Sequence, residues 1–233
     1  GGLSHHGLAQ AAVPFYCHPQ LYPPLGAGTA GCIGVALFGG DAAKFGEGQT
    51  AFGVLDALVG LSDAVFAVRG NCDEETVLTF LENAGICVER SLTFRDGFAF
   101  CGAGGGTKFS LDTPFERDED EIVSDLLVSK TPEIGGEDGV PLVLIVHNPP
   151  KNTNCDKIPG DVHVGSEKIR AFIEDVQPLL VVTGHIHESA GVSVIGSATV
   201  VNPGSLLEGK YAVAFAQKNE EKWNIANVEL KNL

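Results

Sequence analysis

Two histidines separated by one residue, His185 and His187, follow the apolar run at residues 179–182. Imidazole is the side chain that most often binds metal ions. In open α/β sheets, ligands gather at the carboxyl ends of the strands. Histidine pairs also occur in ordinary polar loops, so this motif alone is compatible with a metal site and with a solvated turn.

Three further polar residues stand close behind apolar runs. They are Asp41, Asn71 and His147, which follow residues 34–38, 64–68 and 142–146. A carboxylate can bridge two cations, and neutral nitrogen and oxygen ligands can complete each coordination shell. Each residue also has an ordinary role available: a helix N-cap for Asp41, a turn for Asn71 and a buried, hydrogen-bonded histidine for His147. Five such residues just behind predicted strands, in this order, favour a dinuclear metal site over chance.

The periodicity of apolar residues predicts the elements that would position these side chains. Strands are expected at residues 34–38, 64–68, 91–94, 98–100, 142–146, 179–182, 192–195, 199–201, 211–216 and 223–230, and helices at 50–61, 74–84, 118–130 and 167–175. The first helix is expected to bury Phe52, Leu55, Leu58 and Val59. Residues 8–31 contain four prolines without clear periodicity, so we expect irregular structure there. Strands that alternate with helices indicate a largely parallel α/β architecture, and the strand-rich end indicates a mixed sheet.

Composition limits the classes of function. The 233 residues are 44% hydrophobic, enough for a sizeable core, and carry a formal net charge of -15, which argues against a broad nucleic-acid surface. No apolar run approaches the ~18 residues of a membrane span, so we expect no membrane partner. The first ten residues do not resemble a secretion signal, and the six cysteines show no dense spacing, which indicates reduced thiols and a cytoplasmic location. A small anionic substrate remains compatible with this charge, and the oligomeric state stays open.

The motifs Gly40-Asp41, Gly70-Asn71-x-Asp73, His147 and Gly184-His185-x-His187 occur in an order that resembles the calcineurin-like metallophosphoesterase superfamily. The details are most similar to small bacterial and archaeal proteins related to cyclic-nucleotide phosphodiesterases. Thr113-Pro114-Phe115-Glu116 and Asn202-Pro203-Gly204-Ser205 support the resemblance, which covers residues 34–215. It implies an α/β fold that is a four-layer αββα sandwich of two mixed sheets, in a single domain over residues 1–233. Residues 1–31 would be an irregular N-terminal segment without the usual first-strand motif.

The resemblance also implies two divalent metal ions, of which manganese, iron, zinc and nickel are the candidates. Asp41 would bridge the two ions; Asn71, His147 and His185 would hold one of them, and His187 would help to hold the other. Asp41, Asn71 and His147 would form the catalytic centre, with Asn71 also binding substrate. The implied reaction is attack of a metal-bound hydroxide on a small phosphate ester, with phosphodiesters favoured.

Two features depart from the superfamily pattern. Cys72 occupies the place where most members have a histidine that helps the transition state or the leaving group. No Asp-x-His motif precedes Asp41, and the nearest match is residues 4–6, in which His6 would be the metal ligand. His163, in a loop before Ser166, could contact substrate phosphate or could be a solvated loop histidine. The missing motif leaves an alternative, a catalytically impaired scaffold for protein–protein interaction, as in the retromer coat subunit of the same superfamily.

Overall fold

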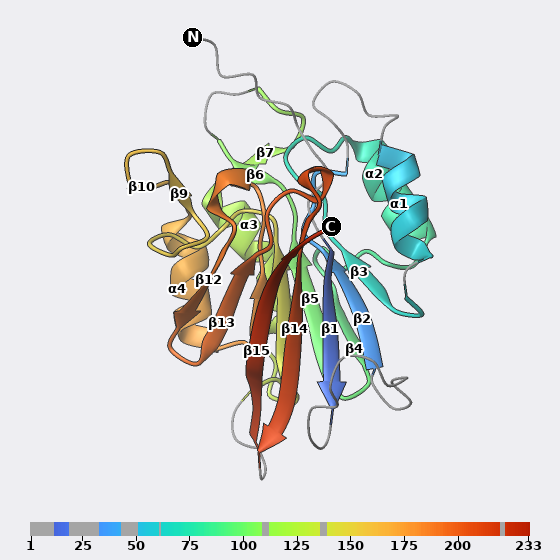
Figure 1. Cartoon of the computed structure of the whole chain (residues 1–233), viewed down its shortest axis with the longest axis vertical. Coiled ribbons are helices and arrows are strands. Elements are labelled where there is room, and N and C mark those ends of the chain that lie inside the picture. Colours follow the sequence, from blue (N-terminus) through green and yellow to red (C-terminus); the bar gives the residue numbers. More distant parts are fainter. Residues whose placement is uncertain are drawn as a thin grey trace.

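The computed structural model describes residues 12–18, 33–42, 51–60, 62–108, 112–135, 139–219 and 222–233. Two mixed sheets dominate this part of the chain (Figure 1). The first has the order β15 (Lys222–Asn232), β14 (Lys210–Asn219), β1 (Ala12–His18), β2 (Ile33–Phe38) and β3 (Val65–Ala67). The second has the order β12 (Gly191–Ile195), β13 (Ala198–Asn202), β11 (Leu180–Val182), β8 (Leu142–Val146), β5 (Phe98–Ala103) and β4 (Leu92–Arg95). The mixed α/β class and the strand-rich carboxyl-terminal part agree with the sequence prediction.

Apolar side chains from both sheets share one core. Leu37 of β2 and Phe66 of β3 belong to the same buried cluster as Phe100 of β5 and Ile145 of β8. The rings of Phe66 and Phe100 lie 4.4 Å apart between centroids. Residues i and i+2 of a strand point to the same face, so alternate residues of β2 and β8 supply this core and the intervening ones face helices.

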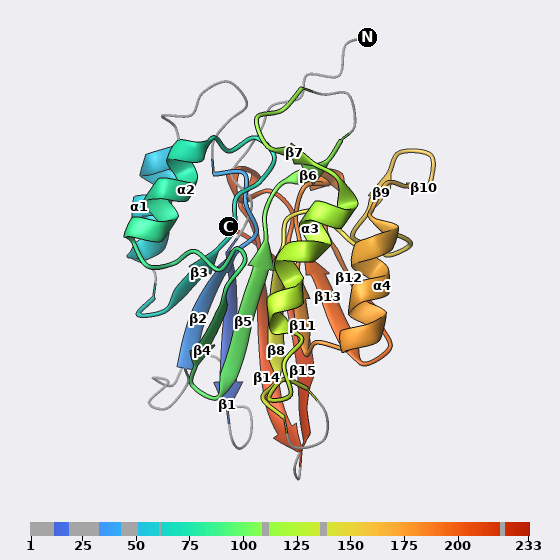
Figure 2. The same cartoon turned by 180° about the vertical axis from the view of Figure 1, so that it is seen from behind.

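Four helices cover the outward-facing side chains of these strands. They are α1 (Ala51–Val59), α2 (Glu75–Asn83), α3 (Glu119–Leu126) and α4 (Glu167–Val176). Side chains of α1 and α2 pack with β2 and β3, whereas α3 and α4 pack with β5, β8 and β11 (Figure 2). None of the helices in the described ranges is long and apolar enough to cross a membrane.

Local sequence signals explain where these helices begin and end. Asp118 and Glu121 form a capping box at the start of α3. The Ser166 hydroxyl accepts a hydrogen bond from the amide of Ile169 at the start of α4, as the sequence predicts. Gly85, with φ of +68°, follows the last turn of α2 in the left-handed conformation that glycine adopts easily. The two amino-terminal caps thus end the loops that follow β5 and β8.

The predicted buried face of α1 is wrong in part. Leu55 is fully buried, but Phe52 and Val59 are 37% and 41% exposed, and the side chain of Leu58 lies outside the described part. The residue that shares the buried face with Leu55 is Ala51, one helical turn earlier. A small residue lets the helix lie close to the sheet, a role that a search for large apolar residues overlooks.

The expectation of irregular structure over residues 8–31 is also wrong where the structure describes that segment. Residues 12–18 form β1, which pairs with β14 in parallel and with β2 in antiparallel orientation. Pro14 has no N–H to donate and is uncommon inside sheets, which is why its presence argued against a strand. The rest of that segment lies outside the described residues.

Candidate metal centre

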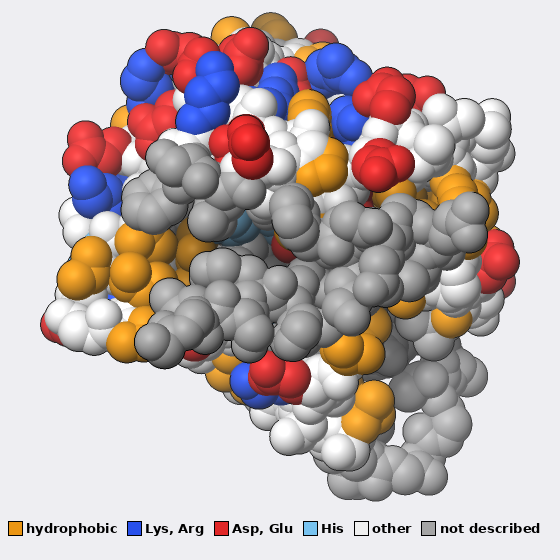
Figure 3. All heavy atoms as spheres, turned by 90° about the horizontal axis from the view of Figure 1, so that it is seen from above, with side chains coloured by type: hydrophobic (Ala, Val, Ile, Leu, Met, Phe, Trp, Pro, Cys, Tyr) orange, Lys and Arg blue, Asp and Glu red, His pale blue; other side chains and the backbone are white. Residues whose placement is uncertain are grey.

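Four of the predicted ligands meet at one edge of the two sheets. Asp41 follows β2, Asn71 follows β3, and His147 and His185 follow β8 and β11. One ligand atom from each of Asp41, His147 and His185 lies within 4.8 Å of the others. Figure 3 views the molecule from the edge at which these strands end, and histidine atoms are visible in a hollow near the centre of that face.

Asn71 is the hub of the cluster. Its Oδ1 atom lies 2.9 Å from Nε2 of His147 and 2.8 Å from Nδ1 of His185. Nε2 of His147 is also 3.5 Å from Oδ2 of Asp41. Carboxylate oxygen, amide oxygen and imidazole nitrogen form the mixed donor set that divalent transition metals accept.

The hydrogen bonding of His147 fixes which ring nitrogen can bind a metal. Its Nδ1 atom lies 2.7 Å from the carbonyl oxygen of Gly39. A carbonyl oxygen only accepts, so Nδ1 carries the proton and, in the neutral ring, Nε2 presents a lone pair. That lone pair faces the oxygens of Asn71 and Asp41, and three electron-rich atoms converging in a fully buried place fit a cation between them.

Burial keeps the histidine pair in its metal-binding form. Desolvation, together with repulsion from His147, lowers the pKa of His185 to about 3, although the carboxylate of Asp41 acts in the opposite direction. Burial also lowers the pKa of His187. Both imidazoles are therefore neutral at pH 7. Within the described part of the chain, Nε2 of His187 is buried without a hydrogen-bond partner, as expected of an atom placed to bind a cation.

Comparison with known proteins identifies the family. A family model of metallophosphoesterases of the calcineurin superfamily matches residues 139–226, which include His147, His185 and His187. A relative of 36% identity over 172 residues, the uncharacterized protein MJ1162 of Methanocaldococcus jannaschii, is matched over 74% of its length and 70% of this chain. The chain belongs to the calcineurin superfamily of metallophosphoesterases.

Solved structures are consistent with this metallophosphoesterase fold. The protein TT1561 of Thermus thermophilus superposes with a TM-score of 0.60 at 16% identity, over 96% of this chain and 99% of its own. Another crystal structure superposes with a TM-score of 0.59 at 21% identity, over 79% of this chain and 71% of its own. At these identities the comparison concerns the fold alone.

The metallophosphoesterase site is built on two glycine turns in contact. A Cβ atom on Gly70 would overlap the carboxylate of Asp41, and one on Gly40 would lie 2.5 Å from the Gly70 nitrogen. Asp41 and His185 themselves have φ values of 54° and 66°, which residues other than glycine seldom adopt. Glycine is therefore required at positions 40 and 70 for the two turns to bring Asp41 beside Asn71.

Asp73 is a residue whose importance the sequence reasoning missed. It is fully buried, and its Oδ2 atom accepts hydrogen bonds from the amides of Gly70, at 2.7 Å, and Ala42, at 3.1 Å. The amide of Cys72 donates in turn to Oδ1 of Asp41. These bonds tie the loop after β2 to the loop after β3. The motif Gly-Asn-x-Asp carried the signal, but only its asparagine received a role.

Cys72 lies beside the carboxylates of Asp41 and Asp73. Burial, followed by these two negative charges, raises the pKa of its thiol. The thiol therefore stays protonated near neutral pH and is not a nucleophile.

His163 pairs with an aspartate outside the ligand cluster. Its Nδ1 atom lies 2.7 Å from Oδ1 of the fully buried Asp156. Asp156 also accepts from the amides of Asn152, Thr153 and Gly165. His163, in β10 (Val162–His163), thus helps to anchor the hairpin that it forms with β9 (Lys157–Ile158). Contact with substrate phosphate stays a prediction.

His6 lies outside the described residues. The strand in the place next to β2 is β1, and it runs antiparallel to β2, with Ala12 opposite Phe38. The carboxyl end of β1 therefore lies at the edge of the sheet opposite Asp41. The amino end of β1, and not its carboxyl end, is thus at the edge of the sheet that carries Asp41.

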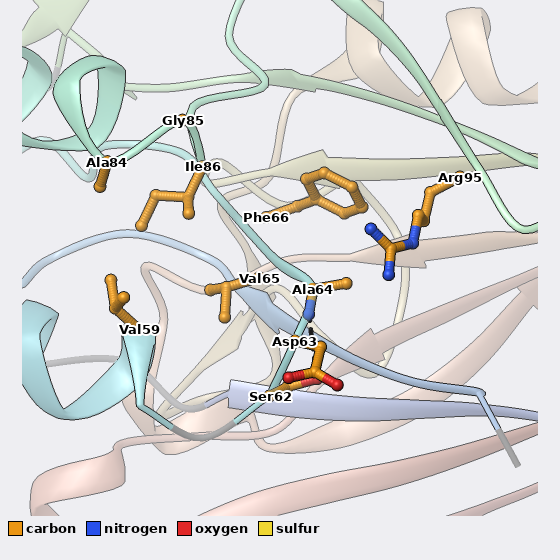
Figure 4. A pocket seen from close by; sticks show the side chains of 10 residues that line it. All are labelled: Val59, Ser62, Asp63, Ala64, Val65, Phe66, Ala84, Gly85, Ile86 and Arg95. Atoms are coloured by element: carbon orange, nitrogen blue, oxygen red, sulfur yellow. Dashed lines mark hydrogen bonds between the residues drawn. The ribbon is translucent and has the colours of Figure 1, made fainter.

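A cavity of about 230 Å³ opens at that opposite edge (Figure 4). Its lining comes mainly from the segment that leads into β3 and from the end of α2, with Arg95 at one side. Arg95 pairs with its neighbour Asp96 at 2.8 Å. None of the predicted ligands in the described ranges lines this cavity, so it is separate from the metal centre.

Proposed function

We propose that this chain hydrolyses phosphate esters, with phosphodiesters favoured, at a site that holds two divalent metal ions. The observation that carries the proposal is the convergence of oxygen and nitrogen donor atoms from Asp41, Asn71, His147 and His185. The hydrogen bond between Nδ1 of His147 and the Gly39 carbonyl leaves the Nε2 lone pair of this ring facing the other ligands. Membership of the metallophosphoesterase superfamily supports the same reaction class.

The donor set divides between two cations. Asn71, His147 and His185 would hold the first, and Asp41 would bridge it to a second. Among the described residues Nε2 of His187 has no hydrogen-bond partner, which supports a place for the second cation, with His6 as its proposed further ligand. Manganese, iron, zinc and nickel all accept this mixture of nitrogen and oxygen donors. When bound, such cations lower the pKa of a water nucleophile and stabilise charge on phosphoryl oxygens.

The protein's own groups prepare the site for that chemistry. Burial lowers the pKa of His185 and of His187, which keeps both rings neutral at pH 7 without a bound ion. Asn71 would contact both cation and substrate. The protonated thiol of Cys72 is a weak acid here, because its raised pKa opposes proton release. We therefore propose that the enzyme prefers substrates whose leaving groups need little protonation.

The wider setting is proposed on the same basis. The two sheets and the helices that cover their outer faces would form the four-layer αββα sandwich of the superfamily, as a single domain over residues 1–233. The substrate would be a small phosphate ester in the cytoplasm. The charge of -15 argues against a broad nucleic-acid surface.

Hydrolysis of an aryl phosphodiester with Mn²⁺ tests the proposal. The protein is first treated with chelator, and rates are measured with and without added Mn²⁺. We expect metal-dependent hydrolysis by the wild type and only the metal-free rate for Asp41→Asn. Asp120→Asn removes an exposed carboxylate near the start of α3 and should retain the wild-type rate. A wild type that binds no Mn²⁺ and hydrolyses no faster than Asp41→Asn would favour the scaffold alternative.

A further inference from the structure

The orientation of the Asn71 amide decides whether the metal centre can form. The two ends of an asparagine side chain differ in kind, because the oxygen accepts and the NH₂ group donates. Only the oxygen can bind a cation. His147 and His185 both face Oδ1, so a half-turn of the amide would point two N–H groups at the cation. Some group must therefore hold the other end.

Two acceptors face that end: Sγ of Cys72, 3.7 Å from Nδ2 of Asn71, and the hydroxyl of Thr113, which lies closer. Nδ2 of Asn71 donates a hydrogen bond of 3.1 Å to Oγ1 of Thr113. The NH₂ group has no lone pair to offer, so the threonine oxygen must be the acceptor in this bond. In the reversed amide, Oδ1 would face that same lone pair, and the hydrogen bond would be lost.

Glu116 fixes the polarity of the threonine hydroxyl. Oγ1 of Thr113 lies 3.2 Å from Oε1 of Glu116, and the amide of Thr113 donates to the same oxygen at 3.3 Å. A hydroxyl has one proton. Because that proton points to the carboxylate, a lone pair is left for Asn71. Carboxylate, hydroxyl and amide thus form a chain in which each bond sets the direction of the next.

The segment that carries Thr113 is fastened to both sides of the metal centre. The amide of Phe115 donates to the carbonyl of Asn71 at 2.9 Å, and the Phe115 carbonyl accepts from the amide of Gly106. The Phe115 ring lies 3.9 Å from the guanidinium of Arg69, which is buried and ion-paired with Glu89 at 3.1 Å. These contacts of Phe115 fix the position of Thr113 relative to Asn71.

We propose that Thr113, oriented by Glu116, is a positioning residue that locks the Asn71 amide with its oxygen toward the cation. This inference rests on the proposed function, since it concerns the same metal centre. It also gives a physical role to the sequence Thr-Pro-Phe-Glu at residues 113–116. The side chain of Thr113 acts through Asn71 and has no recorded contact with the other ligands in the described part of the chain.

Mn²⁺ binding to the chelator-treated protein, followed by electron paramagnetic resonance, tests the lock without measuring catalysis. Thr113→Val removes the hydroxyl and keeps the shape. We expect it to raise the Mn²⁺ dissociation constant about 10–100-fold, the usual effect of losing a group that orients a ligand. Thr113→Ser should restore binding to nearly the wild-type value. Thr79→Val, the same change on the exposed face of α2, is the matched control and should bind as the wild type does.

A double-mutant cycle with Asn71→Ala separates positioning from general support of the fold. If Thr113 acts through Asn71, Thr113→Val adds no further loss when Asn71 is already alanine. Equal losses in both backgrounds would overturn the inference. Should Thr113→Val fail to fold, Glu116→Ala replaces it, since that change leaves the hydroxyl but removes what directs its proton.

Failure of the inference differs from failure of the proposed function. A wild type without Mn²⁺ binding overturns both. A wild type that binds Mn²⁺ while Thr113→Val binds equally well overturns only the role of Thr113.

Discussion

Acidification of the metal-free protein from pH 8 to pH 5 should lower its free energy of unfolding by about 2 kcal/mol through His185 alone. Desolvation lowers the pKa of this imidazole to about 3 in the folded protein, from an ordinary value of 6.5. In the unfolded chain, His185 is therefore protonated near pH 6.5, whereas in the folded chain it is protonated only near pH 3. Stability is complete above pH 6.5 and is lost as the pH falls toward 3.

The magnitude follows from the separation of the two pKa values. Each pH unit within that window costs about 1.4 kcal/mol for one proton. The span from 6.5 to 5 gives about 2 kcal/mol, and carboxylates with ordinary pKa values contribute little above pH 5. His187 also has a lowered pKa, so the wild-type protein should lose more than the amount assigned to His185.

Urea denaturation in chelator, followed by fluorescence, measures this loss. Trp223 is the single tryptophan, and its ring packs 4.9 Å from that of Phe98, so its emission should report loss of the shared core. His185→Asn should reduce the change between pH 8 and pH 5 by about 2 kcal/mol while His187 maintains a residual dependence. An unchanged pH dependence in His185→Asn would refute the assignment of a neutral, buried imidazole.

Three other changes test the framework of the site. Gly70→Ala should destabilise the protein by at least about 1–3 kcal/mol and weaken Mn²⁺ binding, because the new Cβ overlaps Asp41. Gly53→Ala, in open space on α1, is the control and should be neutral or stabilise by about 0.5–1 kcal/mol. Equal unfolding curves for the two variants would contradict the packing argument. Asp73→Ala should cost about 2–6 kcal/mol in urea denaturation, since two buried amides lose their acceptor at about 1–3 kcal/mol each; a cost under about 1 kcal/mol would show that water replaces it. At pH 8, Cys72 in the folded protein should react with iodoacetamide more slowly than Cys72 in the urea-unfolded protein, because its raised pKa leaves little thiolate. Mass spectrometry of the peptide that contains Cys72 measures both rates. Equal rates would mean that the thiol is exposed.

Much of the fold was predictable because the apolar pattern repeats along the chain. The strands β2, β8 and β11 read as apolar runs in the sequence, and the side chains of β8, of β11 and of residues 35–38 in β2 are buried. The grouping of polar residues was predictable for a related reason. Neighbouring parallel strands end at the same edge, so residues placed just after β8 and β11 must lie near each other.

Other features depend on contacts between distant segments, and no local pattern announces them. The proton position on His147 follows from the carbonyl of Gly39, 108 residues earlier. The orientation of Asn71 follows from Thr113, 42 residues later. Both contacts are made by groups common anywhere in a protein. Their role depends on how the two sheets pack, because that packing determines which atoms of distant segments face the ligands.

The backbone of the metal centre gives an argument for function that does not depend on family membership. Asp41 and His185 occupy left-handed conformations that cost non-glycine residues about 1–3 kcal/mol. Glycine would relieve this strain at either position, and the chain uses glycine freely nearby, at Gly40 and Gly70. Local backbone preference would therefore favour glycine at both places. The aspartate and the histidine persist against that preference, as expected of side chains that are needed for their contacts in this cluster, which for Asp41 include the hydrogen bond from the Cys72 amide.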